Sequence, residues 1–231
     1  MVRKRLSRIM MRTNCDEKGG FMEKITFLEL LDILKHYDFY DWEDEGKKQY
    51  QFNLAMPEKL LEKLNFPEFY ESFGIEAVQN RNAERNLKVA EWLEIENTFL
   101  NWLKNVENSV FTKKNMIVTP YFEKNWYLYS VKKWMQKDYK KYINYLKNQG
   151  VIATPMEFHE DYRGAKIENF QELIMLFKMA IRGVPLLFLV DYEWAFIVTD
   201  SLTIRMVFKN ESILKEKRNV LKSQLDFQLL E

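Results

Sequence analysis

The stretch 183–208 constrains the fold more than any other part of the chain, because its apolar residues follow the spacing of β-strands. Residues 184–190 are continuously apolar, as in a strand that is buried on both faces. Residues 194–199 are mostly apolar, and after a short polar break residues 202–209 alternate between apolar and polar side chains. Alternation with a period of two is typical of a half-buried strand. The three segments together predict an antiparallel meander.

Outside this meander, apolar residues recur every three or four positions, which is the pattern of amphipathic helices. The expected helices span residues 23–37, 57–64, 68–73, 83–107, 124–148, 167–182 and 211–230. A short strand is expected at residues 116–119. We therefore predict an α+β fold, in which a predominantly helical N-terminal part packs on a small C-terminal antiparallel β-meander that a terminal helix closes.

The chain is expected to form one globular unit with two regions. Its 231 residues, 47% of them hydrophobic, are enough to bury a sizeable core. Gly150, Pro155 and Gly164 interrupt a stretch with little helical pattern, and this places the boundary between a mainly helical region, 22–150, and an α+β region, 151–231.

Residues 1–21 are expected to be a basic, flexible extension. The codons for residues 18–21 can form a purine-rich sequence of the kind that precedes a bacterial start codon, so one hypothesis is that translation starts at Met22. The alternative is a genuine basic arm of the kind that contacts nucleic acid.

Composition argues against several classes of protein. With 35 basic and 34 acidic residues, the formal charge of +1 gives no overall field that would attract nucleic acid or an anionic membrane. The apolar stretch 184–198 is interrupted by Asp191 and Glu193 and is too short to span a bilayer. The sequence shows no signal-peptide core, no glycine-rich phosphate-binding motif and only one cysteine, Cys15. We expect a cytoplasmic protein that needs no cofactor and makes no contact with a membrane.

The segment that follows the first expected helix is both acidic and aromatic. Residues 38–45 hold five carboxylates and no basic residue, interleaved with aromatic rings. Exposed rings are effective anchors in protein interfaces, and carboxylates steer basic partners toward them. The alternative is a helix exit whose rings enter the core. The candidate protein-binding set is Tyr37, Asp38, Asp41, Trp42, Glu43, Asp44 and Glu45.

The segment 123–147 shows the opposite charge. It holds seven lysines against Glu123 and Asp138, with tyrosine and tryptophan residues between them. Basic residues interleaved with stacking rings are typical of proteins that bind single-stranded nucleic acid. The alternative is an ordinary amphipathic helix whose rings turn inward and whose lysines are solvated. The candidate nucleic-acid-binding set is Lys132, Lys133, Lys137, Lys140 and Lys141.

A third candidate is a metal-dependent hydrolase. Glu157 and His159 are close in sequence, and a second segment that contains Asp191 would have to complete a metal site. The spacing does not match the HExxH pattern, and a polar loop is the simpler interpretation.

The C-terminal end of the chain resembles a known class of proteins. Residues 194–200, Trp-Ala-Phe-Ile-Val-Thr-Asp, are followed by a second strand and a helix that starts at Glu211. This order is similar to the end of several small bacterial immunity proteins, which bind and neutralise polymorphic toxins. The resemblance covers residues 184–231 and identifies no binding residue.

The sequence as a whole favours a binding protein over an enzyme. The leading hypothesis is a bacterial inhibitor, immunity-type or related to conflict with phages, whose partner is another protein such as a basic toxin or a phage protein. A nucleic-acid-binding module is the first alternative, and the metal-dependent hydrolase is the second.

Overall fold

An antiparallel sheet organises the part of the chain that the structure, a computed structural model, describes. The described residues are 22–35, 50–64, 88–107, 115–120, 126–153, 162–199, 202–222 and 227–230. The strands are β1 (Lys24–Ile25), β2 (Gln51–Ala55), β3 (Met116–Thr119), β4 (Gly164–Ile167), β5 (Leu187–Val190), β6 (Trp194–Val198), β7 (Thr203–Phe208) and β8 (Gln228–Leu230). The helices are α1 (Phe27–Leu34), α2 (Glu58–Lys63), α3 (Val89–Val106), α4 (Gln136–Asn148), α5 (Phe170–Ile181) and α6 (Glu211–Lys222), and a 3₁₀ turn, η4 (Lys133–Met135), leads into α4.

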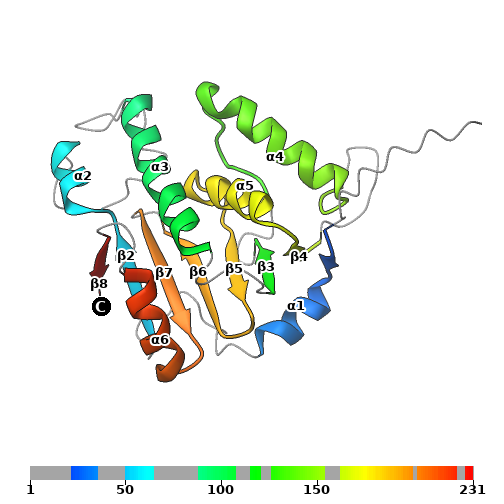
Figure 1. The fold of residues 1–231 in the computed structure, drawn as a ribbon. Helices are drawn as coiled ribbons and strands as arrows, with labels where there is room; N and C mark the ends of the chain where they lie inside the picture. The colour runs from blue at the N-terminus through cyan, green and yellow to red at the C-terminus, as the bar shows by residue number, and fades with distance from the viewer. Residues whose placement is uncertain are drawn as a thin grey trace, which may run out of the picture.

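The described strands form an open, eight-stranded sheet in the order β1-β4-β3-β5-β6-β7-β2-β8 (Figure 1). Every neighbouring pair in this sheet is antiparallel. The predicted meander, β5-β6-β7, lies near its centre, and α6 follows it directly. The α+β class is therefore confirmed. The sheet is wider than the meander alone, because it takes strands from both sides of residue 150.

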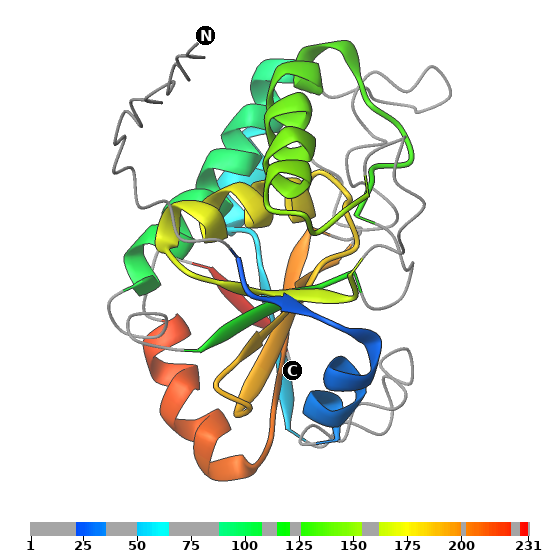
Figure 2. The ribbon, with the colours of Figure 1, turned by 90° about the vertical axis from the view of Figure 1, so that its right-hand side faces the viewer.

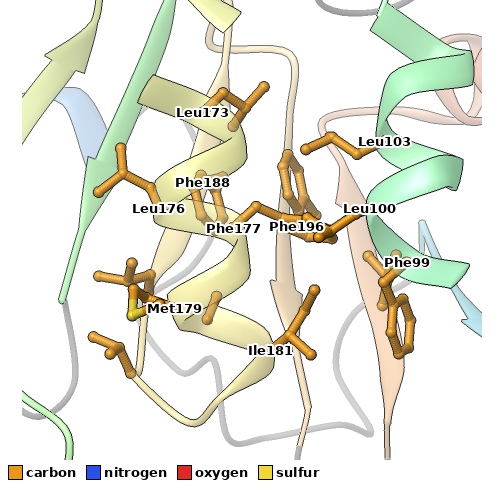
Figure 3. Packing of buried hydrophobic residues seen from close by; sticks show 14 of the residues in the cluster. Phe99, Leu100, Leu103, Leu173, Leu176, Phe177, Met179, Ile181, Phe188 and Phe196 are labelled. Atoms are coloured by element: carbon orange, nitrogen blue, oxygen red, sulfur yellow. The ribbon is translucent and has the colours of Figure 1, made fainter. Parts of the chain in front are cut away.

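Alternation along the strands gives the sheet two different faces. Phe188 of β5 and Phe196 of β6 point toward the larger group of helices, and their rings stack with centroids 4.8 Å apart. Phe177 of α5 contacts both rings edge-on (Figure 3). Neighbouring positions, such as Leu187 and Ala195, point to the opposite face, where they pack in the cluster that includes the buried residues of α1. This follows from the period of two along a strand.

The helices divide between these faces. Buried residues of α2, α3, α4, α5 and α6 belong to the main core cluster, whereas α1 supplies Leu30 and Leu34 to the cluster on the other face. Figure 2 shows α1 and α6 on opposite sides of the sheet. None of the helices that the described residues form has the length and the apolar character required to cross a membrane.

Several expected elements agree with the structure. The strand at residues 116–119 is confirmed as β3, and the helix at residues 57–64 is confirmed as α2 with Pro57 at its N-cap. Within the expected helix 83–107, the described part is helical as α3. The expected helix at residues 68–73 lies outside the described residues, as does the extension 1–21.

Two expected helices begin later than the apolar spacing suggests. The helix at residues 23–37 begins at Phe27, because Lys24 and Ile25 pair with β4 as an edge strand and Thr26 caps the helix through Glu29. The helix at residues 167–182 begins at Phe170. Ile167 belongs to β4, and the Asn169 side chain accepts a hydrogen bond from the backbone N–H of Glu172.

Two further helices are shorter than expected because contacts distant in sequence determine the conformation. In the expected helix 124–148, residues 126–132 are not helical, and the indole N–H of Trp126 donates to the carbonyl of Tyr162 over 2.9 Å. The terminal helix expected at residues 211–230 ends at Lys222, and residues 228–230 pair with β2 at an edge of the sheet.

Candidate functional site

The lysines of the candidate nucleic-acid-binding set lie on and just before α4, which lies at the periphery of the molecule next to α5 (Figure 1). Lys133, Lys137, Lys140 and Lys141 are exposed, and Lys132 is half-buried. The inner side of α4 is held by Tyr142 and Leu146, which are fully buried in the main core. The sequence pattern therefore predicts the orientation of this helix correctly. We call Lys133, Lys137, Lys140 and Lys141 the lysine face.

Most of the rings between these lysines turn inward. The hydroxyl of Tyr142 donates to the carbonyl of Trp126 over 2.9 Å, and the ring of Trp126 is fully buried. Tyr139 and Tyr145 are half-buried against the core. Burial raises the pKa of Tyr142, Tyr139 and Tyr145 above that of a free tyrosine, so that each hydroxyl stays protonated at neutral pH. These rings act in packing.

Two tyrosines before α4 are more accessible. The Tyr129 side chain is 79% exposed and that of Tyr127 is 36% exposed. Both precede the lysine face in sequence, in the non-helical stretch 126–132. They are the accessible tyrosines of this part of the chain, and the helix itself presents lysine, asparagine and glutamine side chains to solvent.

Asp138, the one acidic residue within α4, turns toward the interior. Its carboxylate accepts a hydrogen bond from the Lys178 ammonium over 2.7 Å and lies 3.1 Å from the Nη2 atom of Arg182. Partial burial raises the pKa of the Asp138 carboxyl, but the hydrogen bond and positive charge of Lys178, together with Arg182, outweigh burial and bring the pKa below its ordinary value. Asp138 is thus ionised at neutral pH, and Lys178 and Arg182 balance its negative charge.

The same cations join α5 to α3. Arg182, which is 1% exposed, makes a two-point ion pair with the equally buried Glu96 of α3, and its Nη2 atom lies 2.9 Å from the Glu96 carboxylate. Lys178 lies 3.5 Å from that carboxylate, and the Arg182 guanidinium stacks 5.0 Å from the ring centroid of Trp134. Two cations and two carboxylates balance each other. We call Glu96, Asp138, Lys178 and Arg182 the buried ion network after its central pair, Glu96 and Arg182, whereas Asp138 and Lys178 are partly exposed.

The sequence pattern does not identify this network. Glu96 occupies a position on the buried side of α3, four residues after Trp92 and three before Phe99. A carboxylate on an apolar helix face requires a buried partner. The position of Glu96 among apolar residues therefore indicates that a partner exists, but not which residue it is. Its partner, Arg182, is 86 positions away at the end of another helix, a pairing that spacing does not indicate.

The candidate protein-binding set, Tyr37 to Glu45, lies outside the described residues. Both flanks of that segment are described. Leu34 ends α1 and packs in the cluster behind the sheet, and Phe52 of β2 packs in the main core in front of it. The chain on either side of the segment is therefore anchored in the folded core.

The candidate metal site is only partly described. Glu157 and His159 lie outside the described residues. Asp191 lies in the turn between β5 and β6 with a φ of 49°, and its carboxylate accepts a hydrogen bond from the backbone N–H of Asn115 over 2.6 Å. Within the described ranges, no group of three or more His, Cys, Asp or Glu side chains is placed to bind a metal ion.

Comparison with protein-family models, curated proteins and solved structures finds no match to this chain.

Proposed function

We propose that this protein is a bacterial inhibitor of the immunity type, or one that acts in conflict with phages, and that it works in the cytoplasm by binding another protein without catalysing a reaction. Its partner is a basic protein, such as a toxin or a phage protein. The proposed contact set is Tyr37, Asp38, Asp41, Trp42, Glu43, Asp44 and Glu45.

The observation that carries this proposal is the anchoring of the chain on both sides of the acidic aromatic segment. Leu34 and Phe52 belong to core clusters on opposite faces of the sheet. A segment with both ends fixed loses less conformational freedom on binding than a free tail does. Its rings can supply buried area, and its five carboxylates can steer a basic partner.

The order of elements at the C-terminal end gives further support. The meander β5-β6-β7 is followed directly by α6, in the order that the resemblance to immunity proteins implies, and the strand β8 that follows α6 is not part of that resemblance. This support concerns the architecture, and the choice of contact residues depends on the composition of the segment 37–45.

Charge reversal tests the proposal. The partner is first isolated by affinity capture from the native host and identified by mass spectrometry, and its association rate is then measured at several salt concentrations. The triple variant Asp41→Lys, Glu43→Lys, Asp44→Lys should associate at least about tenfold more slowly at low salt and lose the salt dependence, because steering charges act mainly on the association rate. Its melting temperature should stay nearly unchanged.

A matched control separates this effect from a change in overall charge. The variant Glu58→Lys, Glu62→Lys, Glu211→Lys carries the same charge change on exposed positions of α2 and α6 and should associate like the wild type. Equal rates for the wild type and the Asp41, Glu43, Asp44 variant would remove the segment from the binding site.

A further inference from the structure

We propose that the lysine face of α4 binds the phosphate backbone of double-stranded nucleic acid. The lysine face and the proposed contact set 37–45 have no residue in common, and the proposal does not depend on the inhibitor function. Three features of α4 support the proposal: the arrangement of its lysines, the inward orientation of Asp138 and the burial of its rings.

The lysines share one side of the helix. Each residue of an α-helix turns by about 100°, so Lys137, Lys140 and Lys141 fall within an arc of about 100° that lies opposite Tyr142. Tyr142 is fully buried, and the three lysines are exposed. Lys133, in the 3₁₀ turn before α4, is exposed as well.

No carboxylate neutralises this face within the described part of the chain. Asp138 pairs with Lys178 and Arg182 on the inner side of α4. None of the ion pairs among the described residues involves a lysine of the lysine face. Four positive charges are therefore available to an anionic partner.

The burial of the rings selects the kind of nucleic acid. Single strands bind by stacking their bases on open aromatic faces. On η4 and α4, Tyr142 is fully buried, and Tyr139, Tyr145 and Trp134 are packed against the core, so the accessible rings near the lysine face are Tyr127 and Tyr129 in the non-helical stretch before it. In a duplex the bases are already stacked on one another, and the surface it presents is a dense array of phosphates that lysines can contact without reading sequence.

The dimensions agree with this geometry. At 1.5 Å per residue, the lysine face from Lys133 to Lys141 extends about 12 Å. Duplex DNA carries one negative charge per roughly 1.7 Å of its axis, so about seven phosphates fall within that length. An extended acidic peptide carries about half that charge density, at one charge per roughly 3.4 Å. These phosphates belong to both strands and are distributed around the axis, and the four lysines meet those on the facing side.

The test measures binding of the full chain to a labelled 20-base-pair DNA duplex, the corresponding RNA duplex and the 20-nucleotide single strand, by fluorescence anisotropy between 50 and 200 mM salt. Four phosphate contacts predict a slope of log K against log salt of about −3.6, which is a loss of affinity of about 150-fold over this range. Both duplexes should bind more tightly than the single strand. Poly-L-glutamate at equal charge should compete poorly with either duplex.

Substitution of the lysine face identifies the surface. Lys133→Gln, Lys137→Gln, Lys140→Gln, Lys141→Gln together should bring the slope close to zero, and the pair Lys137→Gln, Lys141→Gln should reduce it by about two. The control variant Lys59→Gln, Lys88→Gln, Lys104→Gln, Lys209→Gln removes the same charge from exposed positions elsewhere and should retain the wild-type slope. The pair variant provides the test if the fourfold variant fails to fold.

Four results would overturn the proposal. Tighter binding to the single strand would show that bases stack on accessible rings and that a duplex is not the preferred ligand. Competition by poly-L-glutamate as strong as that of a duplex would indicate an acidic protein as the partner. Absent duplex binding, or equal losses in the control variant and in the lysine-face variants, would show that α4 has no specific role.

Discussion

At the scale of single residues, the orientation of Asp138 decides the charge of α4. The residue lies four positions before Tyr142 and so on the buried side of the helix, where it meets Lys178 and Arg182. Sequence alone counts this carboxylate against the neighbouring lysines. In the structure its carboxylate, 36% exposed, is turned toward Lys178 and Arg182, so the outer surface of α4 is more basic than the sequence count suggests.

Asp138 should make the stability of the protein depend on pH. Its pKa in the folded state lies below the ordinary value of 3.8, so its ionised form stabilises the fold above that pH, and this contribution is lost as pH falls through the folded-state pKa. We expect Asp138→Asn to have a lower free energy of unfolding than the wild type at pH 7. The difference between the two proteins should become smaller as pH falls from about 4 toward 2. Urea unfolding at several pH values measures it, and a constant gap would contradict the assigned ion pairs.

At the scale of elements, the buried ion network fixes three helices relative to one another. Arg182, at the end of α5, contacts Glu96 of α3 and Asp138 of α4. A buried pair contributes little net stability compared with apolar residues of the same size, but it requires its partners to stay in one arrangement. The network therefore helps to hold α4 with its lysine face outward.

Removal of one partner from the Glu96–Arg182 pair should be costly. Glu96→Leu leaves the buried guanidinium of Arg182 without its main carboxylate, and we expect the free energy of unfolding to fall by about 3–5 kcal/mol. The double variant Glu96→Leu, Arg182→Met should lose less than the single variant, because no charge then lacks its partner. Chemical denaturation measures both. A loss below about 1 kcal/mol in Glu96→Leu would show that the pair is not buried as described.

The elements that sequence predicts well are those whose pattern is local. The meander and β3 are continuous or alternating apolar runs, and the cores of α3 and α5 repeat with helical spacing. The strands β1 and β8 fall within expected helices, because each has only two or three residues. Their partners, β4 and β2, are far away in the chain. Apolar spacing over so few residues does not distinguish a strand from a turn of helix.

The candidate sites follow the same rule. The exposure of Lys137, Lys140 and Lys141 could be predicted, because helical spacing alone places them opposite Tyr142. The partners of Asp138 could not, since Lys178 is 40 positions away on another helix. Contacts between elements depend on how the elements pack, and a single sequence does not contain that information directly.

At the scale of the whole molecule, acidic and basic residues are concentrated in different segments of the sequence although the total charge is close to neutral. The sequence has a formal charge of +1, yet residues 38–45 hold five carboxylates and α4 presents the lysine face to solvent. Two segments of opposite charge allow two partners of different chemistry, a basic protein and a nucleic-acid duplex. We propose that the exterior of this protein performs its function by binding.

Hydrogen exchange of the protein, alone and in complex with the partner captured from its native host, tests this claim most directly. A binding surface becomes protected when the partner excludes solvent from it and stabilises its backbone. We predict slower exchange in the peptides that cover residues 36–49 of the complex, and unchanged exchange in the central strands β5 and β6. If exchange slows elsewhere in the complex but not in the peptides that cover residues 36–49, the result would contradict the proposed mode of binding.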